Sequence, residues 1–122
     1  MAKVLIVDDA SFMRAVLKKI VTGQGHVIVG EAASGDEAID KYQQLKPDIT
    51  LMDIVMPPGT KAKDGIEALK QIMLADPAAK VIMCSSMGQQ ALITDALTAG
   101  AKDFVTKPFK PEKVIEVLLK CS

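Results

Sequence analysis

The sequence predicts an α/β fold in which strands and helices alternate within one domain. Short apolar runs recur along the chain, and an amphipathic stretch follows each run, which is typical of repeated strand–helix units around a parallel sheet. Of the 122 residues 49% are hydrophobic, with three Phe, one Tyr and no Trp, so aliphatic side chains must build the core. This length favours a single domain spanning residues 1–122.

Strand–helix units account for the whole chain. The predicted strands lie at residues 4–7, 26–32, 48–52, 81–84 and 103–105. The predicted helices lie at residues 12–20, 34–45, 66–73, 89–98 and 111–118, where apolar residues recur at helical spacing. No linker, repeat or low-complexity segment lies between these units, so we expect no second functional domain.

Start and stop signals delimit the first two predicted helices. Gly23 and Gly25 end the first helix, because glycine readily adopts the conformations that terminate helices. Ser34 and Glu37 form a capping box at the start of the second helix, in which each side chain can accept a hydrogen bond from the backbone N–H at the other position. Pro47 closes this helix, since proline cannot continue the helical hydrogen bonds.

The other three helices carry signals of the same kind. A loop rich in Pro, Gly and Lys, residues 56–63, precedes the third helix, and Pro77 marks its end. Gly100 ends the fourth helix. Pro111 can occupy the first turn of the last helix, where a backbone N–H is not needed.

Polar side chains that could take part in a reaction follow the ends of the predicted strands. Asp8 and Asp9 follow the first strand, and Asp53 follows the third. Ser85 comes after the fourth strand and Lys107 after the fifth. The carboxyl ends of parallel strands share one edge of the sheet, so these side chains should converge there if the four strands are neighbours.

Three converging carboxylates need a cation. Two carboxylates about 4 Å apart repel by roughly 4 kcal/mol at an effective dielectric of about 20. Mg²⁺ fits, because it prefers oxygen ligands and is typically held by one or two carboxylates together with phosphate oxygens. Lys107 supplies a positive charge that can stabilise a transferring phosphoryl group.

Each member also has a plainer interpretation when taken alone. Asp8 and Asp9 could cap a helix, Asp53 could be an ordinary loop carboxylate, Lys107 a solvated lysine and Ser85 a loop or cap hydroxyl. The placement of all five at one predicted edge favours phosphoryl chemistry over coincidence.

Composition argues against several other classes of protein. Fifteen basic residues balance fifteen acidic ones, and no basic stripe could follow a nucleic-acid backbone, so no direct nucleic-acid binding is expected. No segment approaches the ~20 apolar residues of a membrane span, and the N-terminus does not have the pattern of a signal peptide. Cys84 and Cys121 are expected to be free thiols. We therefore expect a cytoplasmic protein without membrane insertion.

Several segments together resemble a known family, the receiver domains of two-component response regulators. The segments are VLIVDDASFMR, LMDIVMP, VIMCSSM and AKDFVTKPF, and the likeness extends over essentially the whole chain. It is strongest to the single-domain receivers of chemotaxis. The resemblance implies a flavodoxin-like, doubly wound parallel sheet of five strands in the order 2-1-3-4-5, with five helices.

The resemblance also implies roles for the residues at the strand ends. Asp53 would be the phosphoacceptor. Asp8, Asp9, Asp53 and the backbone carbonyl of Val55 would hold Mg²⁺, with Mn²⁺ as the alternative ion. Lys107 would pair with the phosphoryl oxygens.

The remaining implied roles belong to a conformational switch. Ser85 would donate its hydroxyl to the phosphoryl group, and the ring of Phe104 would swing inward in response. The peptide between Lys107 and Pro108 would be cis, as is common in the family. The surface that changes would be the fourth helix, fifth strand and fifth helix.

The implied function is that of a phosphorylation-activated response regulator, with chemotaxis as the expected setting. A histidine kinase would phosphorylate the protein, and a target such as the flagellar motor switch would bind it, with a phosphatase as a further partner. A monomer is expected. It would be no enzyme beyond catalysing its own Mg²⁺-dependent phosphorylation and dephosphorylation. The sequence leaves open another phosphorelay, or a receiver excised from a larger regulator.

Two features depart from the family pattern. Residues 58–63 make the loop before Asp64 and Gly65 about four residues longer than usual, which is either a tolerated insertion or a segment that modulates access and partner choice. Val55 and Met87 are apolar at positions that the family uses to control attacking water, which predicts a long-lived phosphorylated form.

Three other functions are compatible with an α/β fold. A flavin-binding protein would need a Ser-, Thr- or Gly-rich phosphate cradle after the first strand, where Asp8 and Asp9 stand instead. A phosphatase of the haloacid dehalogenase type would carry a D-x-D pattern there, whereas this sequence has DDAS. A binding module without phosphorylation would not need the chemistry present at five positions.

Overall fold

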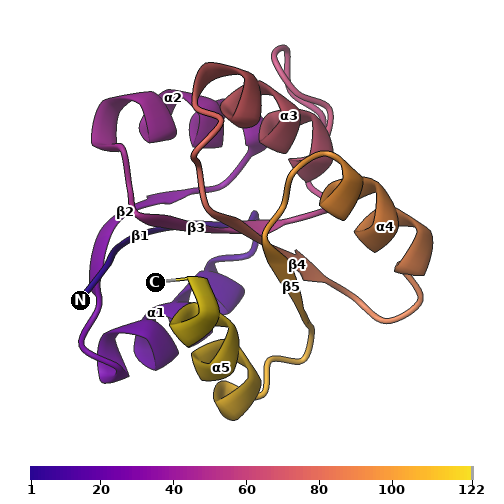
Figure 1. Ribbon diagram of the computed structural model, residues 1–122. Coiled ribbons are helices and arrows are strands. Elements are labelled where there is room, and N and C mark those ends of the chain that lie inside the picture. The colour runs from indigo at the N-terminus through magenta and orange to yellow at the C-terminus, as the bar shows by residue number, and fades with distance from the viewer. Residues whose placement is uncertain (122) are drawn as a thin grey trace.

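The computed structural model describes residues 1–121 and shows a parallel five-stranded sheet with helices on both faces (Figure 1). The strand order is β2-β1-β3-β4-β5, so the predicted flavodoxin-like fold is confirmed. The strands are β1 Lys3–Val7, β2 Val27–Ala32, β3 Ile49–Asp53, β4 Val81–Ser85 and β5 Asp103–Thr106. The helices are α1 Ser11–Gly23, α2 Gly35–Leu45, α3 Gly65–Ala75, α4 Gln90–Thr98 and α5 Pro111–Cys121.

The core consists of two aliphatic layers separated by the sheet. Helices α2, α3 and α4 cover one face, and α1 and α5 cover the other (Figure 1). Alternate residues of β1 serve the two layers: Leu5 and Val7 pack toward α2 and α3, whereas Val4 and Ile6 pack toward α1 and α5. All four of these side chains are fully buried, as the continuous apolar run predicts for a strand covered on both faces.

Helix α2 begins with a modified form of the predicted capping box. The hydroxyl of Ser34 accepts a hydrogen bond from the Glu37 N–H at 3.2 Å, as expected. The carboxylate of Glu37, however, accepts from the N–H of Ala33 at 2.8 Å. The reciprocal half of the prediction was therefore wrong by one residue, because the chain bends so that the preceding N–H faces the glutamate.

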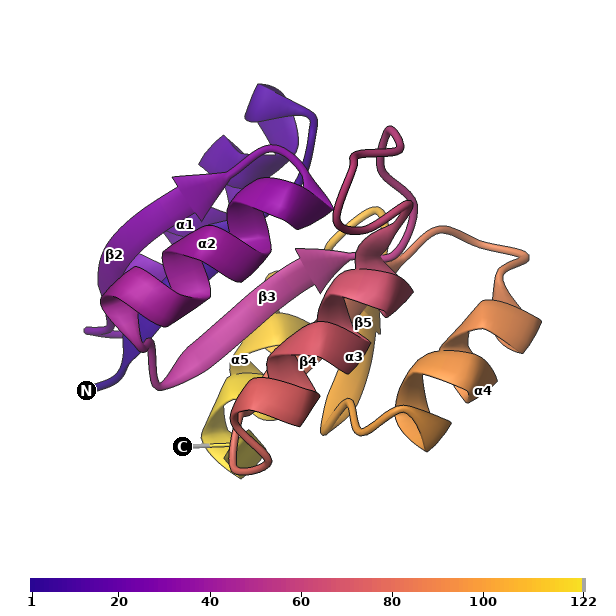
Figure 2. The ribbon, with the colours of Figure 1, turned by 90° about the horizontal axis from the view of Figure 1, so that it is seen from above.

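The strand boundaries place the predicted site residues at one edge. Asp53 and Ser85 are the last residues of β3 and β4, so each strand ends one residue later than the sequence pattern suggested. Val7 pairs with Met52, and Asp53 pairs with Cys84, so the residue after β1 lies beside the end of β3. Figure 2 shows the loop between β3 and α3 rising from this carboxyl edge.

Candidate functional site

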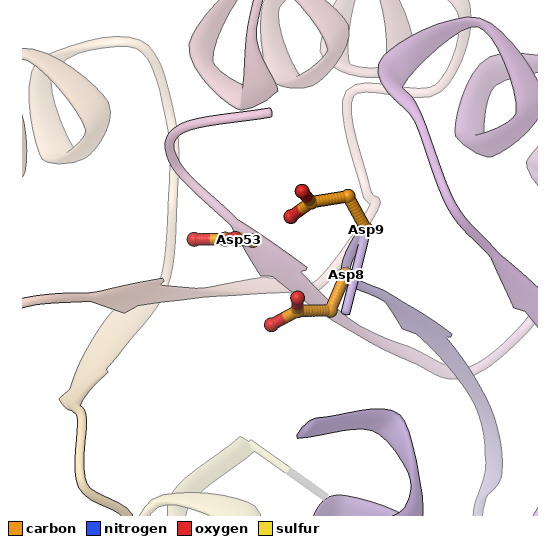
Figure 3. A group of neighbouring side chains, drawn as sticks. All are labelled: Asp8, Asp9 and Asp53. Carbon is orange, nitrogen blue, oxygen red and sulfur yellow. The ribbon is translucent and has the colours of Figure 1, made fainter. Parts of the chain in front are cut away.

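Three carboxylates meet at the carboxyl edge of the sheet. Asp8 and Asp9 follow β1 and Asp53 ends β3, and Figure 3 shows the three side chains pointing to the same side. One oxygen from each lies within 4.8 Å of the other two. Asp8 and Asp53 are buried, with 1% and 6% of their surface exposed, while Asp9 is exposed. The site is thus open to solvent on the side of Asp9.

Asp8 does not cap helix α1. Its Oδ1 accepts a hydrogen bond from the N–H of Ala10 at 2.9 Å, within the turn between β1 and α1. The N-cap residue of α1 is Ala10, and no side chain caps it. The acidic pair therefore does not cap the helix. The second oxygen of Asp8 is directed into the acidic cluster.

Lys107 joins two of the three carboxylates. Its Nζ lies 2.9 Å from Asp8 Oδ2 and 3.1 Å from Asp53 Oδ2. Its backbone N–H donates to the carbonyl of Ser85 at 2.7 Å, and the following peptide to Pro108 is cis, as the sequence comparison with receivers implied. Burial alone would lower the pKa of Lys107, but the hydrogen bond to Asp8 and the charge of Asp53 outweigh it and raise that pKa.

The charges at this edge do not balance. Three carboxylates face one ammonium group, which leaves negative charge in excess. Burial raises the pKa of Asp53 above its usual value, and the charges of Asp8 and Asp9 raise it further while Lys107 opposes them. A divalent cation with oxygen ligands would offset this excess, and the all-oxygen donor set fits Mg²⁺ or Mn²⁺. The residues present therefore fit the ion that the resemblance implied.

Ser85, the last residue of β4, has an unusual hydroxyl. Its side chain is fully buried, and among residues 1–121 its Oγ has no hydrogen-bond partner. A buried hydroxyl without a partner carries a desolvation cost, commonly about 1 to 3 kcal/mol. An oxygen acceptor brought to the end of β4 would relieve that cost.

Comparison with known proteins agrees with this geometry. Residues 4–119 match the family described as the response regulator receiver domain. The chain belongs to that family. A relative called chemotaxis protein CheY, from Thermotoga maritima, is 56% identical over 120 residues, which cover 98% of this chain and 97% of the relative. A protein of the same name from Listeria monocytogenes is 53% identical over 122 residues and 99% of its own length.

Solved receiver structures have the same fold. A chain of the CheX–CheY–BeF3–Mg²⁺ complex from Borrelia burgdorferi superposes with a TM-score of 0.89 at 41% identity, covering 97% of this chain and 87% of that one. The response regulator domain of Thermotoga maritima CheB gives a TM-score of 0.83 at 43% identity, covering 98% and 92%. This receiver is therefore a component of two-component signalling.

The other residues singled out in the receiver sequence follow β3 and β4, or lie within β5. Val55 and Met87 are 52% and 82% exposed, so both present apolar surface to solvent near the site. Phe104 is partly buried and packs against the core layer under α2, α3 and α4. A pocket of about 430 Å³ lies at this end of β5 and is lined by Met87, Phe104, Lys107, Lys110 and Val114 among others.

The extended loop of this receiver is anchored to α2 by Asp36, which sequence analysis missed. The Asp36 carboxylate accepts hydrogen bonds from the N–H groups of Thr60, Lys61 and Ala62 and from the Thr60 hydroxyl, at 2.9 to 3.0 Å. These bonds hold the pKa of Asp36 below its usual value even though partial burial opposes them. Lys61 Nζ also lies 2.5 Å from Asp40 Oδ1. The added residues thus form a fixed structure.

Arg14 of α1 is a second residue that the sequence did not reveal. Its guanidinium contacts the backbone of Asp8 and the carboxylate of Glu31 on β2. An arginine three residues into an amphipathic helix ordinarily indicates an exposed side chain, so no sequence signal distinguished it.

Among residues 1–121 no helix is long and apolar enough to cross a membrane.

Proposed function

We propose that this receiver is a response regulator that accepts one phosphoryl group on Asp53 in a Mg²⁺-dependent reaction. The observation that carries the proposal is the acidic cluster at the carboxyl edge, where Lys107 bridges Asp8 and Asp53 and the buried hydroxyl of Ser85 has no partner within residues 1–121. Residues 1–122 would form a single receiver domain.

Asp53 would act as the nucleophile. One carboxylate oxygen attacks the phosphorus of a phosphohistidine on a histidine kinase, an O–P bond forms, and the N–P bond breaks as the imidazole leaves with the electron pair. Mg²⁺, held by Asp8, Asp9, Asp53 and the carbonyl of Val55, would neutralise charge on the phosphoryl oxygens when bound. Lys107, whose Nζ lies 3.1 Å from Asp53 Oδ2, would exchange this contact for one with a phosphoryl oxygen.

Phosphorylation would be read out through Ser85 and Phe104. A hydrogen bond from Ser85 to a charged oxygen contributes about 1.5 to 3 kcal/mol, whereas reversing a 1:99 equilibrium needs about 5.5 kcal/mol. Lys107 and the metal must therefore contribute to the switch. The response would involve the α4, β5 and α5 surface, which includes the pocket beside Phe104 and is our candidate for target binding.

The proposed setting is chemotaxis. It is supported by relatives named chemotaxis protein CheY that match over nearly their whole length. The partners would be a histidine kinase, a target such as the flagellar motor switch, and a phosphatase. The solved complex of CheX with CheY shows that a relative binds a second protein. The protein would act in the cytoplasm, which its two free thiols support. It would be a monomer, and its catalysis would be limited to its own phosphorylation and dephosphorylation.

Intact-mass measurement after incubation with acetyl phosphate tests the proposal. We expect the wild type to gain the mass of one phosphoryl group when Mg²⁺ is present and none when Mg²⁺ is removed with a chelator. Asp53→Asn is expected to gain no mass in either condition. An unmodified wild type, or phosphorylation of Asp53→Asn to the same extent, would refute the proposal.

A further inference from the structure

Arg14 connects two elements at the base of the acidic cluster. Its Nη1 donates to the carbonyl oxygen of Asp8 at 2.6 Å, and its Nε donates to Glu31 Oε1 at 2.9 Å. The guanidinium is planar and its donors have fixed directions, so two simultaneous contacts define its orientation. Only 18% of the side chain is exposed, although the residue lies on a surface helix.

The carbonyl that Arg14 contacts belongs to the peptide between Asp8 and Asp9. This peptide is planar, so the direction of its carbonyl sets the position of the next Cα atom. The N–H of Asp8 is fixed on its other side by a 3.0 Å hydrogen bond to the carbonyl of Ala32. Arg14 therefore fixes the backbone unit from which two of the three carboxylates extend.

Glu31 keeps Arg14 in this place. Its second oxygen accepts from Lys18 Nζ at 2.8 Å, and Lys41 donates to its backbone carbonyl. The hydrogen bond from Lys18, together with that from Arg14, holds the pKa of Glu31 below its usual value despite some burial, so the carboxylate stays charged at neutral pH. The anchor for the guanidinium is thus a permanent negative charge.

We propose that Arg14 is a positioning residue that orients Asp8 and Asp9 for metal binding through the Asp8 carbonyl, with Glu31 as its anchor. This inference rests on the proposed function, because it presumes that the acidic cluster binds Mg²⁺. Groups that orient the ligands of a metal, without touching it, commonly change metal affinity about 10- to 100-fold when removed.

The direction in which Mg²⁺ affinity changes when Arg14 is replaced distinguishes a positioning role from a simple effect of its charge. Arg14 carries a positive charge close to the cluster, so charge alone predicts that removing it should tighten the binding of a dication. Loss of positioning predicts weaker binding. Lys18 provides a matched control, because it pairs with the same Glu31 at nearly the same distance, and within residues 1–121 it forms no hydrogen bond or ion pair with Asp8.

The test is calorimetric titration of Mg²⁺ into the metal-free wild type, Arg14→Met and Lys18→Met, with thermal unfolding recorded for each protein. We expect Arg14→Met to raise the Kd for Mg²⁺ about tenfold and Lys18→Met to leave it unchanged. A purely structural role would lower the stability of Arg14→Met while the folded protein bound Mg²⁺ normally. Arg14→Met that binds Mg²⁺ as tightly as the wild type, or more tightly, would overturn the inference.

Two further outcomes are decisive. If Arg14→Met does not fold, Arg14→Lys replaces it, because a lysine lacks the two separate, fixed donors, Nε and Nη1, with which Arg14 contacts Glu31 and the Asp8 carbonyl. Arg14→Lys should bind Mg²⁺ more weakly than Lys18→Met does, and equal affinity would overturn the inference. A wild type that binds no Mg²⁺ would instead refute the proposed function, and the role of Arg14 with it.

Discussion

Asp53 is subject to opposing influences at the scale of a single residue. Burial raises its pKa, the neighbouring Asp8 and Asp9 raise it further, and Lys107 lowers it. A nucleophilic carboxylate must nevertheless be ionised. The site therefore holds Asp53 in a state that a cation stabilises, which explains its contact with Lys107.

The titration of Asp53 should reflect these influences. Without metal, we expect its carboxyl group to titrate above pH 3.8, so that protonation, and with it loss of the nucleophile, begins at a higher pH than for an ordinary aspartate. Lys107→Met should raise the midpoint further, because the favourable charge is removed, and saturating Mg²⁺ should lower it. Carbon-13 NMR of the Asp53 carboxyl group measures all three midpoints, and a wild-type midpoint below 3.8 would contradict the account.

Val55 and Met87 lead to a prediction about the lifetime of the phosphorylated protein. Both are exposed and apolar, so neither can orient a water molecule toward the phosphoryl group. We expect the phosphorylated protein to persist well beyond seconds in purified form. Val55→Asn, which adds a hydrogen-bonding side chain, should shorten the lifetime several-fold, whereas Val55→Ala should not. Intact-mass measurement over time follows the loss of the phosphoryl group. Its loss from the wild type within seconds would be incompatible with this prediction.

The sequence allowed prediction of the strand-end residues but not of their supports. Asp8, Asp53 and Lys107 were predictable because parallel strands end at one edge, whatever the details of their loops. The contact of Arg14 with the Asp8 carbonyl was not predictable, since it depends on the exact turn between β1 and α1. Side-chain contacts to backbone atoms leave no periodic signal in a sequence.

At the scale of elements, the start of α3 packs directly against the end of β3. The N–H of Gly65 donates to the carbonyl of Ile54 at 2.7 Å, and a Cβ atom at Gly65 would lie 2.0 Å from the carbonyl oxygen of Asp53. That oxygen is part of the backbone and cannot rotate away. Glycine at this position is therefore required for the approach of the helix to the site.

Gly65→Ala should destabilise the protein by about 2 kcal/mol or more, because the end of β3 must move to admit the methyl group. Gly23 offers a matched control within α1, since a Cβ there meets no atom within 4 Å. Gly23→Ala should be neutral or stabilising by about 0.5 to 1 kcal/mol. Urea unfolding measures both values, and equal effects of the two substitutions would show that the close approach is not the cause.

The loop between β3 and α3 depends on α2 for its structure. Asp36→Ala removes four hydrogen bonds to residues 60–62, whereas Asp40→Ala removes only the ion pair with Lys61. We expect trypsin to cleave after Lys61 or Lys63 much faster in Asp36→Ala than in the wild type, with Asp40→Ala close to the wild type. Equal cleavage rates for the wild type and Asp36→Ala would mean that other contacts order the loop.

Elements themselves were easier to predict than their connections. The alternation of apolar runs and amphipathic stretches was sufficient for all five units, and Pro111 begins α5 as expected. The sequence indicated an extended loop before Asp64, but not its anchor on Asp36. The hydrogen-bond partners of Asp36 are backbone N–H groups, whose directions depend on the loop conformation and not on residue type.

At the scale of the whole molecule, phosphoryl chemistry and stability should be linked through the same charges. A carboxyl group whose folded pKa is raised costs stability at neutral pH; the cost is absent below the unfolded pKa and complete above the folded one. Asp53→Asn should therefore raise the free energy of unfolding of the metal-free protein at pH 7. The difference should vanish when the pH falls below about 3.8.

Mg²⁺ should make the wild type more stable than Asp53→Asn, the reverse of the order expected for the metal-free proteins. A ligand that binds only the folded state at about 100 times its Kd stabilises it by about 2.7 kcal/mol, and the wild type should gain more than Asp53→Asn, which lacks one ligand charge. Urea unfolding with and without Mg²⁺ at pH 7 checks both parts. A metal-free Asp53→Asn that is less stable than the wild type would show that the excess negative charge is not the governing feature of this edge.

The most direct test of the central claim is to locate the phosphoryl group in the chain. Borohydride reduces an aspartyl phosphate to homoserine, so peptide mapping after phosphorylation and reduction identifies the modified residue. The account predicts homoserine at position 53 alone, and only when Mg²⁺ was present during phosphorylation. Modification at Asp8, Asp9 or any other residue, or modification of Asp53 without a divalent cation, would contradict it.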